Sequence, residues 1–449
     1  MELAELYKAE LNDKNLSAIF KGCDDFKRRE LAPGGLFLYA IDGLVASSDI
    51  AQFILRPMAE GLLQGSMEEH YRQALEGKLY NAVAQPAQDL KTAAEFLVYG
   101  FTILLFSNVG AIAFETKSSV KRGPAPPTVE NTVKGAKDAF TETVRYNTAL
   151  LRRHLRTPGL RLETVKVGHR SLTMVTICSV EGLTDPELVA RVRARLSSID
   201  IDGLIDPSAV EEYLTGSRKT AFPLLQYTER TDRFAQSLLD GRVGILVDGL
   251  PLGYLLPVDV GMLMTSEEDR GVDYLSASMV RLLRWGALLI ALLLPGLYIA
   301  MSTFQPEMLP TQLLRSIIKS KTNVPFSTVM EVIGLLLAFE LLQQAGIHLP
   351  QAIGQSVSII GGLVVGTAAV DASLVSPAAL IVAAAAGISG FVLPTRDFAD
   401  AIRLWRLFLA VCAAVAGLFG LTAGVIIFMI HLSATSFGTC SCFLFLLFP

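Results

Sequence analysis

The stretch PFSTVMEVIGLLLAFELLQQAGIHLPQAIGQSVSIIGGLVVGTAAVD, residues 325–371, combines an apolar composition with a few acidic and amide side chains. Its Leu, Val, Ile, Ala and Gly residues suit a lipid bilayer, where a carboxylate costs about 2.5 to 3.5 kcal/mol on insertion scales. Membrane proteins keep such carboxylates where they face water, a partner helix or a pathway. The stretch therefore contains four candidates for an ion path: Glu331, Glu340, Gln355 and Asp371.

Two of these candidates share one predicted helix. Glu331 and Glu340 are nine residues apart, which is about 2.5 turns, so they point to nearly opposite faces and cannot both line one path from a straight helix. Glu331 follows Pro325 closely, where an acidic residue at the membrane edge is the simpler interpretation. Glu340 lies deeper, between Phe339 and Leu341, so we expect Glu340 rather than Glu331 to line the path. A structural ion pair and a protonated carboxyl group are the alternatives.

The charges divide the chain into two parts. Residues 285–449 contain six basic and six acidic residues, so the net charge of −4 lies entirely in residues 1–284. Of all residues, 51% are hydrophobic and the mean hydropathy is +0.44, which is high for a soluble protein. We therefore expect a soluble region followed by a membrane domain at 285–449. The soluble region is slightly acidic and lacks the basic footprint of a nucleic-acid-binding domain.

The N-terminal region is predicted to face the cytoplasm. Its first 20 residues, MELAELYKAELNDKNLSAIF, are charged and lack the apolar segment of a signal peptide. Arg281 and Arg284 precede the first uncharged run at 285–304, as the positive-inside rule expects for a cytoplasmic flank.

The soluble region is predicted to hold two similar α/β subdomains, at 1–117 and 137–284, joined by a Pro-rich polar linker at 118–136. In each subdomain a short apolar run ends in a Gly turn and precedes a helix, as in YAIDGL and CSVEGL. Later in each subdomain a helix precedes two apolar runs that flank a turn, as in ILLFSNVGAIAF and GILVDGLPLGYL. This repeated order indicates an internal duplication, with a chance match as the alternative.

The soluble region lacks the motifs GxGxxG, GxxxxGK[ST] and GxSxG of nucleotide-binding and hydrolytic sites. Asp42, Glu181 and Asp248 adjoin Gly at predicted strand ends, and turn chemistry explains them better than a ligand site does. His154 and His169 are isolated, and we expect them at the surface. We predict no catalytic residues, no cofactor, no metal site and no enzymatic activity.

The membrane domain is predicted to be all-α, with about four to six membrane helices. Residues 285–304 and 407–430 are uncharged spans, and 372–395 is an Ala-rich run whose small side chains permit close helix contacts. Residues 305–324 are too polar to span and fit an interfacial amphipathic helix. Its three basic residues favour the cytoplasmic side, whereas a single crossing by 285–304 favours the opposite side, and the sequence leaves both open.

Several stretches resemble the A subunits of GerA-type spore germinant receptors and their relative, the stage V sporulation protein AF. They include FLYAIDGLV, LLRRHLRTPGLR, FPLLQYTERTDR, LLDGRVGILVDGLP, SASMVRLLRW and IHLSATSFG. The resemblance extends from Leu36 to Gly438 and is most specific between Val324 and Gly366. The sequence departs from the family at Leu336, where a second acidic residue is usual, and in its C-terminal TCSCFLFLLFP.

The resemblance implies a homo-oligomeric ion channel in the inner membrane of an endospore, which releases monovalent cations when a nutrient starts germination. It also implies two partners, a transporter-like B subunit and a lipoprotein C subunit. A secondary transporter with a regulatory domain is an alternative, although the sequence shows no second copy of the segment around Glu331 and Glu340. The sporulation relative acting as an accessory ion channel is another.

Overall fold

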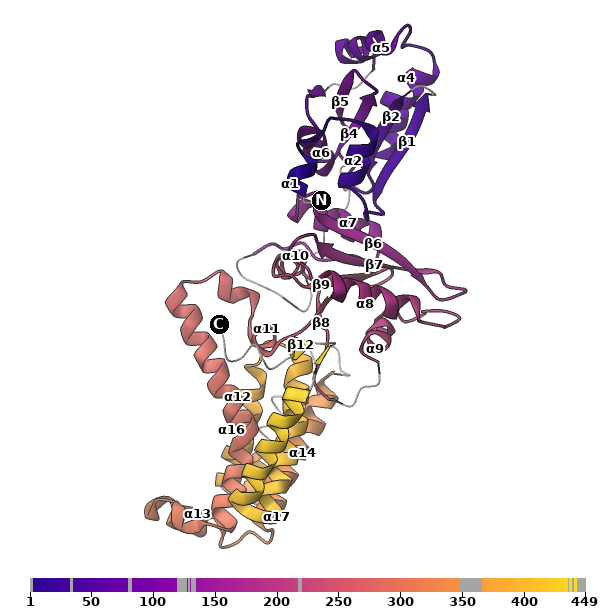
Figure 1. Cartoon of the computed structure of the whole chain (residues 1–449). Coiled ribbons are helices and arrows are strands. Elements are labelled where there is room, and N and C mark those ends of the chain that lie inside the picture. Colours follow the sequence, from indigo (N-terminus) through magenta and orange to yellow (C-terminus); the bar gives the residue numbers. More distant parts are fainter. Residues whose placement is uncertain are drawn as a thin grey trace. The chain divides into compact units, whose positions relative to one another are not determined.

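The computed structural model describes residues 3–32, 35–79, 83–118, 127, 130, 135–216, 220–347, 366–434, 436–437 and 440–441. The chain divides into two compact units. The α/β unit comprises Met1–Ser217 and Leu225–Pro257, and the helical unit comprises Arg218–Leu224 and Val258–Pro449. The strands of the two five-stranded sheets lie in the first unit and the long helices in the second (Figure 1). The predicted fold class, an α/β region followed by a helical region, is confirmed.

The α/β unit contains two antiparallel five-stranded sheets that share one topology. Their spatial orders are β1-β2-β4-β5-β3 and β6-β7-β9-β10-β8, so each strand of the second sheet takes the place of its counterpart in the first. The predicted similarity of the two subdomains is therefore confirmed. The strands are β1 (Phe26–Ala32), β2 (Leu36–Ile41), β3 (Ala84–Ala87), β4 (Phe101–Phe106), β5 (Gly110–Glu115), β6 (Leu160–Val167), β7 (Thr173–Val180), β8 (Gln226–Thr228), β9 (Val243–Val247) and β10 (Gly253–Leu256).

The first sheet is covered on both faces. All six residues of β4 are buried, because alternate side chains of a strand point to opposite faces and each face has its own apolar cluster. Ile103 and Leu105 pack with α2 and α6, whereas Leu104 and Phe106 pack with the π-helical segment η1. The helical elements of this subdomain are α1 (Leu3–Leu6), α2 (Asp13–Ile19), α3 (Ser47–Asp49), η1 (Ile50–Leu55), α4 (Arg56–Ala59), α5 (Met67–Gln73), η2 (Ala74–Lys78) and α6 (Leu90–Val98).

The second subdomain repeats the turn that follows the second strand of the first. Gly43 after β2 and Gly182 after β7 have φ angles of +85° and +82°, a conformation that favours glycine. The helix that follows this turn, α8, starts at Pro186 and is capped by the side chain of Asp185, which accepts a hydrogen bond from the Glu187 amide. The helical elements of this subdomain are α7 (Val144–His154), α8 (Pro186–Ser197), η3 (Pro207–Ala209), α9 (Val210–Thr215) and α10 (Thr231–Leu239).

The helical unit is built around α12, which packs against α16 and α17. By length and composition, α12 and α17 could each cross a membrane, and α16 is apolar but shorter. The elements of this unit are α11 (Val260–Met264), η4 (Glu267–Arg270), α12 (Tyr274–Thr303), η5 (Pro306–Met308), α13 (Thr311–Lys321), α14 (Thr328–Ile347), α16 (Pro377–Phe391), α17 (Arg396–Ala434), β11 (Ser436–Phe437) and β12 (Cys440–Ser441).

The 39-residue element α17 is a helical hairpin. Its backbone leaves the helical conformation at Ala416 and at Gly417, where φ is +60°. The rings of Trp405 and Phe428 are 5.1 Å apart, whereas a straight helix would separate these residues by about 34 Å. The predicted single span at 407–430 is therefore wrong, because the chain reverses within it.

Glycines allow the two arms of this hairpin, 396–415 and 418–434, to pack closely. A Cβ atom at Gly420 would collide with the Cys412 carbonyl oxygen, and one at Gly424 would lie 2.7 Å from a Leu409 methyl group. Small residues four positions apart are the usual means of bringing two membrane helices into contact.

Candidate functional site

The carboxylate of Glu331 is completely buried in the first turn of α14. Its Oε2 accepts a hydrogen bond of 2.7 Å from the backbone amide of Ser376, the N-cap of α16. Its Oε1 lies 3.2 Å from Nζ of Lys321, at the end of α13. The N-terminus of a helix and an ammonium group are both positively polarised, so the two partners of this carboxyl group complement it electrostatically.

Further polar atoms are buried in the helical unit without a hydrogen-bond partner. Three such atoms among the described residues are the Tyr298 hydroxyl, Oε1 of Gln305 and Oε1 of Glu331. The last of them makes no hydrogen bond to a described residue but lies close to the ammonium group of Lys321. Leaving a buried polar group without a hydrogen bond costs about 1 to 3 kcal/mol. Such groups are conspicuous in an apolar bundle and mark places where a cation or a water molecule could bind.

Glu340 forms a separate cluster with the first turns of α17. Its Oε1 lies 3.0 Å from Nη1 of Arg403, which also donates to Oε1 of Gln343 at 2.7 Å. Arg403 contacts Asp400 one turn earlier on α17 as well. The side chain of Glu340 remains 30% exposed, whereas that of Glu331 is 0% exposed.

A second guanidinium is buried in α17, one turn after Arg403. Arg406 is 3% exposed and donates from Nη1 to the carbonyl oxygen of Ala386 at 3.3 Å. Its Nε has no hydrogen-bond partner in the described part of the chain. The start of α17 therefore brings two guanidinium groups close to the carboxylate of Glu340.

The structure does not bring Glu331 and Glu340, two of the four predicted ion-path residues, into one site. Glu331 and Glu340 lie about 13.5 Å apart along the axis of α14 and have partners on different helices. Asp371 is exposed and ends the helical stretch 366–371. Gln355 lies outside the described residues. Which of these side chains contacts a permeating ion stays a prediction.

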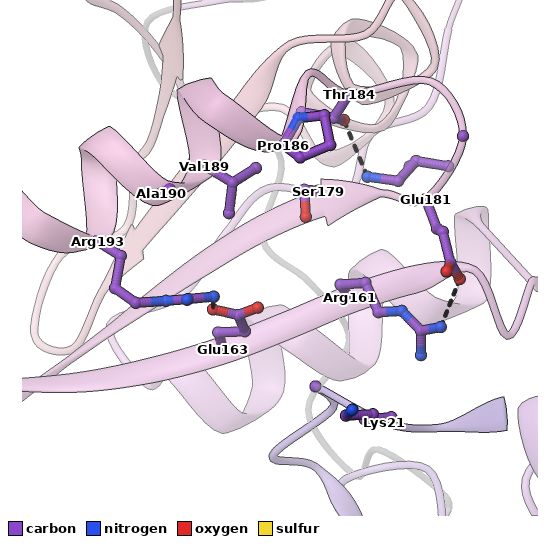
Figure 2. A pocket seen from close by; sticks show the side chains of 13 residues that line it. Lys21, Arg161, Glu163, Ser179, Glu181, Thr184, Pro186, Val189, Ala190 and Arg193 are labelled. Carbon is purple, nitrogen blue, oxygen red and sulfur yellow. Dashed lines mark hydrogen bonds and ion pairs between the residues drawn. The ribbon is translucent and has the colours of Figure 1, made fainter. Parts of the chain in front are cut away.

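A groove of about 500 Å³ lies where the two subdomains of the α/β unit meet (Figure 2). Arg161 of β6 pairs with Glu181 at the end of β7, and Arg193 of α8 pairs with Glu163 of β6. Lys21, from the other subdomain, lies across from them in Figure 2. The volume is in the range of small-molecule pockets, and the paired charges suit a small polar molecule.

Two of the three acidic residues that adjoin Gly, Asp42 and Asp248, serve structural contacts in the α/β unit. Asp248 accepts a hydrogen bond of 2.9 Å from the amide of Val144, at the start of α7. Asp42 lies 2.6 Å from Nη2 of Arg145 on the same helix. Both subdomains therefore hold α7, which agrees with a structural rather than a ligand-binding role for these carboxylates.

Two polar contacts around α7 have no signal in the sequence. Arg152 is completely buried and forms two hydrogen bonds, of 2.7 and 2.9 Å, with the carboxylate of Asp25 in the other subdomain. His154 is exposed, as expected, but it is not isolated, because its Nε2 lies 2.7 Å from Asp138 and 2.9 Å from the hydroxyl of Thr231. These partners are distant in the sequence and no motif connects them.

Comparison with known proteins identifies relatives along nearly the whole chain. The family model described as Bacillus/Clostridium GerA spore germination protein matches residues 14–447. The uncharacterized membrane protein YfkQ of Bacillus subtilis (strain 168) is 34% identical over 95% of this chain and 84% of its own length. Spore germination protein KA of the same organism is 33% identical over 89% of this chain and 73% of its own length. Spore germination protein B1 is also 33% identical, over 89% and 83%.

One solved structure is also similar. It is the crystal structure of the N-terminal domain of the A subunit of the Bacillus megaterium spore germinant receptor GerK3. It is 26% identical, covers 56% of this chain and 96% of its own, and has a TM-score of 0.43.

Proposed function

Because the chain belongs to the Bacillus/Clostridium GerA spore germination protein family, we propose that it is the A subunit of a nutrient-responsive germinant receptor. In this proposal the helical unit spans the membrane and forms a homo-oligomeric channel. The channel releases monovalent cations at the start of germination. The observation that carries the proposal is the presence of paired ionisable side chains, Glu331 with Lys321 and Glu340 with Arg403, inside an apolar helical unit, since such groups in a membrane mark ion pathways.

We assign the two acidic residues of α14 different roles. Glu331 is completely buried between α13, α14 and the N-terminus of α16, so it holds these helices together. Glu340 is partly exposed, so its carboxylate is accessible to a cation. In the present structure the carboxylate of Glu340 is paired with Arg403. In this proposal the paired state is the non-conducting one. Conduction then requires Glu340 to leave Arg403.

The proposal also places the chain in its cellular setting. The chain resides in the inner membrane of the endospore, with the α/β unit in the cytoplasm or spore core. A transporter-like B subunit and a lipoprotein C subunit are its partners. The proposed domain limits are those expected from the sequence, 1–117, 118–136, 137–284 and 285–449, while the helical unit of the structure already begins at Val258. The positive flank of α12, Arg281 and Arg284, supports this orientation.

Replacing Glu340 tests the channel assignment. Spores that carry the Glu340→Gln variant as their A subunit should release cations about ten-fold more slowly after nutrient addition, equal to about 1.4 kcal/mol of barrier. The readout is the rate of potassium release, measured at equal receptor levels. Glu307→Gln makes the same change at an exposed acidic residue and should leave the rate unchanged.

A double variant separates conduction from structure. If Glu340 only pairs with Arg403, then Glu340→Gln/Arg403→Gln should restore the normal rate, because neither partner is left unpaired. If Glu340 contacts the ion, the double variant should remain slow. Normal release by Glu340→Gln, or full rescue by the double variant, would refute the assignment.

A further inference from the structure

The helix α13 is basic and contains no acidic residue. No Asp or Glu occurs from 308 to 330, whereas Arg315, Lys319 and Lys321 all lie on this helix. Lys321 is neutralised within the unit by Glu331, 3.2 Å away, and donates a hydrogen bond to Thr328. Arg315 and Lys319 are exposed. Two positive charges therefore face outward from a helix that Lys321 fixes to α14.

The apolar side chains of α13 occupy the remaining arc of the helix. At 100° per residue, Leu313, Ile317 and Ile318 fall within one arc of about 140°, and Arg315 and Lys319 fall outside it. Ile317, inside the arc, is 7% exposed, whereas Leu313 and Ile318 at its margins are 49% and 60% exposed. A helix with a buried apolar centre, exposed apolar margins and an outward basic face fits a membrane–water interface.

The position of α13 in the helical unit fixes the membrane face concerned. The helix α12 runs without a break from Tyr274 to Thr303, which corresponds to about 45 Å and exceeds the hydrocarbon thickness. Arg281 and Arg284 lie in its N-terminal part, and α13 follows its C-terminal end after η5. The basic residues of α13 thus lie at the opposite end of the span from the positive flank. This placement is opposite to the one that the positive-inside rule favours. A negatively charged partner next to α13 would account for it.

We propose that the outward face of α13 binds anionic phospholipid headgroups, with Arg315 and Lys319 contacting the lipid phosphates. Guanidinium and ammonium groups both pair with phosphate, and the exposed margins Leu313 and Ile318 enter the acyl boundary. Lys321 and Glu331 connect this lipid contact to α14 and α16. The proposal rests on membrane insertion of the helical unit and is independent of ion conduction.

Lipid binding to the full-length protein in detergent micelles tests this proposal. Phosphatidylglycerol and phosphatidylcholine are titrated separately, and bound lipid is counted by native mass spectrometry. Phosphatidylglycerol should bind more tightly to the unaltered protein. Arg315→Gln/Lys319→Gln should weaken its affinity about five-fold for each charge removed, as expected for a basic residue near an anionic surface, and leave phosphatidylcholine binding unchanged.

Two control variants isolate the effect of charge on α13. Lys166→Gln/Arg170→Gln removes the same charge from exposed positions of the α/β unit and should retain full affinity. Arg315→Lys/Lys319→Arg keeps the charge on α13 and should also retain it. Equal affinity of the unaltered protein for both lipids, or unchanged phosphatidylglycerol affinity in Arg315→Gln/Lys319→Gln, would overturn the proposal. The second result would instead assign these charges to a protein partner. The assay measures lipid binding and requires no ion conduction. Its result can therefore be interpreted even if the channel proposal is wrong.

Discussion

At the scale of single residues, the most consequential contact is the buried pair between Arg152 and Asp25. The guanidinium is 0% exposed and the carboxylate 9% exposed, and the two belong to different subdomains of the α/β unit. Removing one partner of a buried pair leaves an uncompensated charge, which typically costs about 3 to 5 kcal/mol. The pair therefore couples the folding of the two subdomains.

We expect Arg152→Ala to lower the free energy of unfolding of the α/β unit by about 3 to 5 kcal/mol. The measurement is urea unfolding of the full-length protein. Arg152→Met/Asp25→Leu, which replaces both charges by apolar groups, should recover most of this loss. Arg170→Ala removes an exposed guanidinium 3.7 Å from Asp202 and should change stability by less than about 0.5 kcal/mol. If Arg152→Ala lowered the free energy of unfolding by no more than Arg170→Ala does, the stabilising role of the Arg152–Asp25 pair would be contradicted.

His154 and Asp138 should make stability depend on pH. The hydrogen bond to Asp138 raises the pKa of His154 above 6.5 despite partial burial, and the same bond lowers the pKa of Asp138 to about 2. The raised histidine pKa contributes stability that is complete below pH 6.5 and is lost as the pH rises through the folded-state pKa. The lowered aspartate pKa contributes stability that is complete above pH 3.8 and is lost as the pH falls towards 2.

The stabilising effect of His154, measured against His154→Gln, should therefore be largest between about pH 4 and 6.5 and shrink above that range. Urea unfolding of both proteins at pH 6 and pH 8.5 gives the comparison. His169→Gln, at a position 71% exposed, serves as the matched control for replacing an exposed histidine. A constant difference between His154→Gln and the unaltered protein at both pH values would exclude the linkage.

At the scale of elements, the close approach of the two arms of α17 depends on the absence of a side chain at Gly420. A Cβ atom there would overlap the Cys412 carbonyl oxygen, which is backbone and cannot rotate away. Extra atoms in a packed interior typically cost about 1 to 3 kcal/mol. This cost should exceed the gain of about 1 kcal/mol that alanine normally brings to a helix.

We therefore expect Gly420→Ala to lower the melting temperature of the full-length protein in detergent. Gly387→Ala is the matched control, because a Cβ at Gly387 of α16 would meet nothing within 4 Å. The control should be neutral or stabilising. If Gly420→Ala melted at or above the temperature of the unaltered protein, the two arms would not pack as described.

Burial explains why some secondary-structure elements could be predicted from the sequence and others could not. β4, FTILLF, is buried throughout, so its apolar run is visible in the sequence. The edge strand β1, FKRRELA, has no buried residue, and β3 contains Pro86 at a sheet edge. These two edge strands carry no continuous apolar run, so no pattern in the sequence predicts them. The turn at Ala416 and Gly417 was missed because small residues surround it.

At the scale of the whole molecule, the candidate site could be predicted only in part. Composition identifies Glu331 and Glu340 as unusual, because carboxylates are costly in an apolar segment. Their partners could not be deduced, because Ser376 and Arg403 lie 45 and 63 positions away and only the packing of the helices brings them near. The family resemblance suggested the proposed function, and the match of residues 14–447 confirms the family.

The hairpin form of α17 has a consequence for the sidedness of the chain. In the proposed membrane-inserted state, the reversal at Gly417 brings the two ends of α17, Arg396 and Ala434, back towards the same membrane surface, whereas a single 39-residue rod would place them on opposite surfaces. A reporter inserted at Ala434 should therefore share its compartment with Arg396.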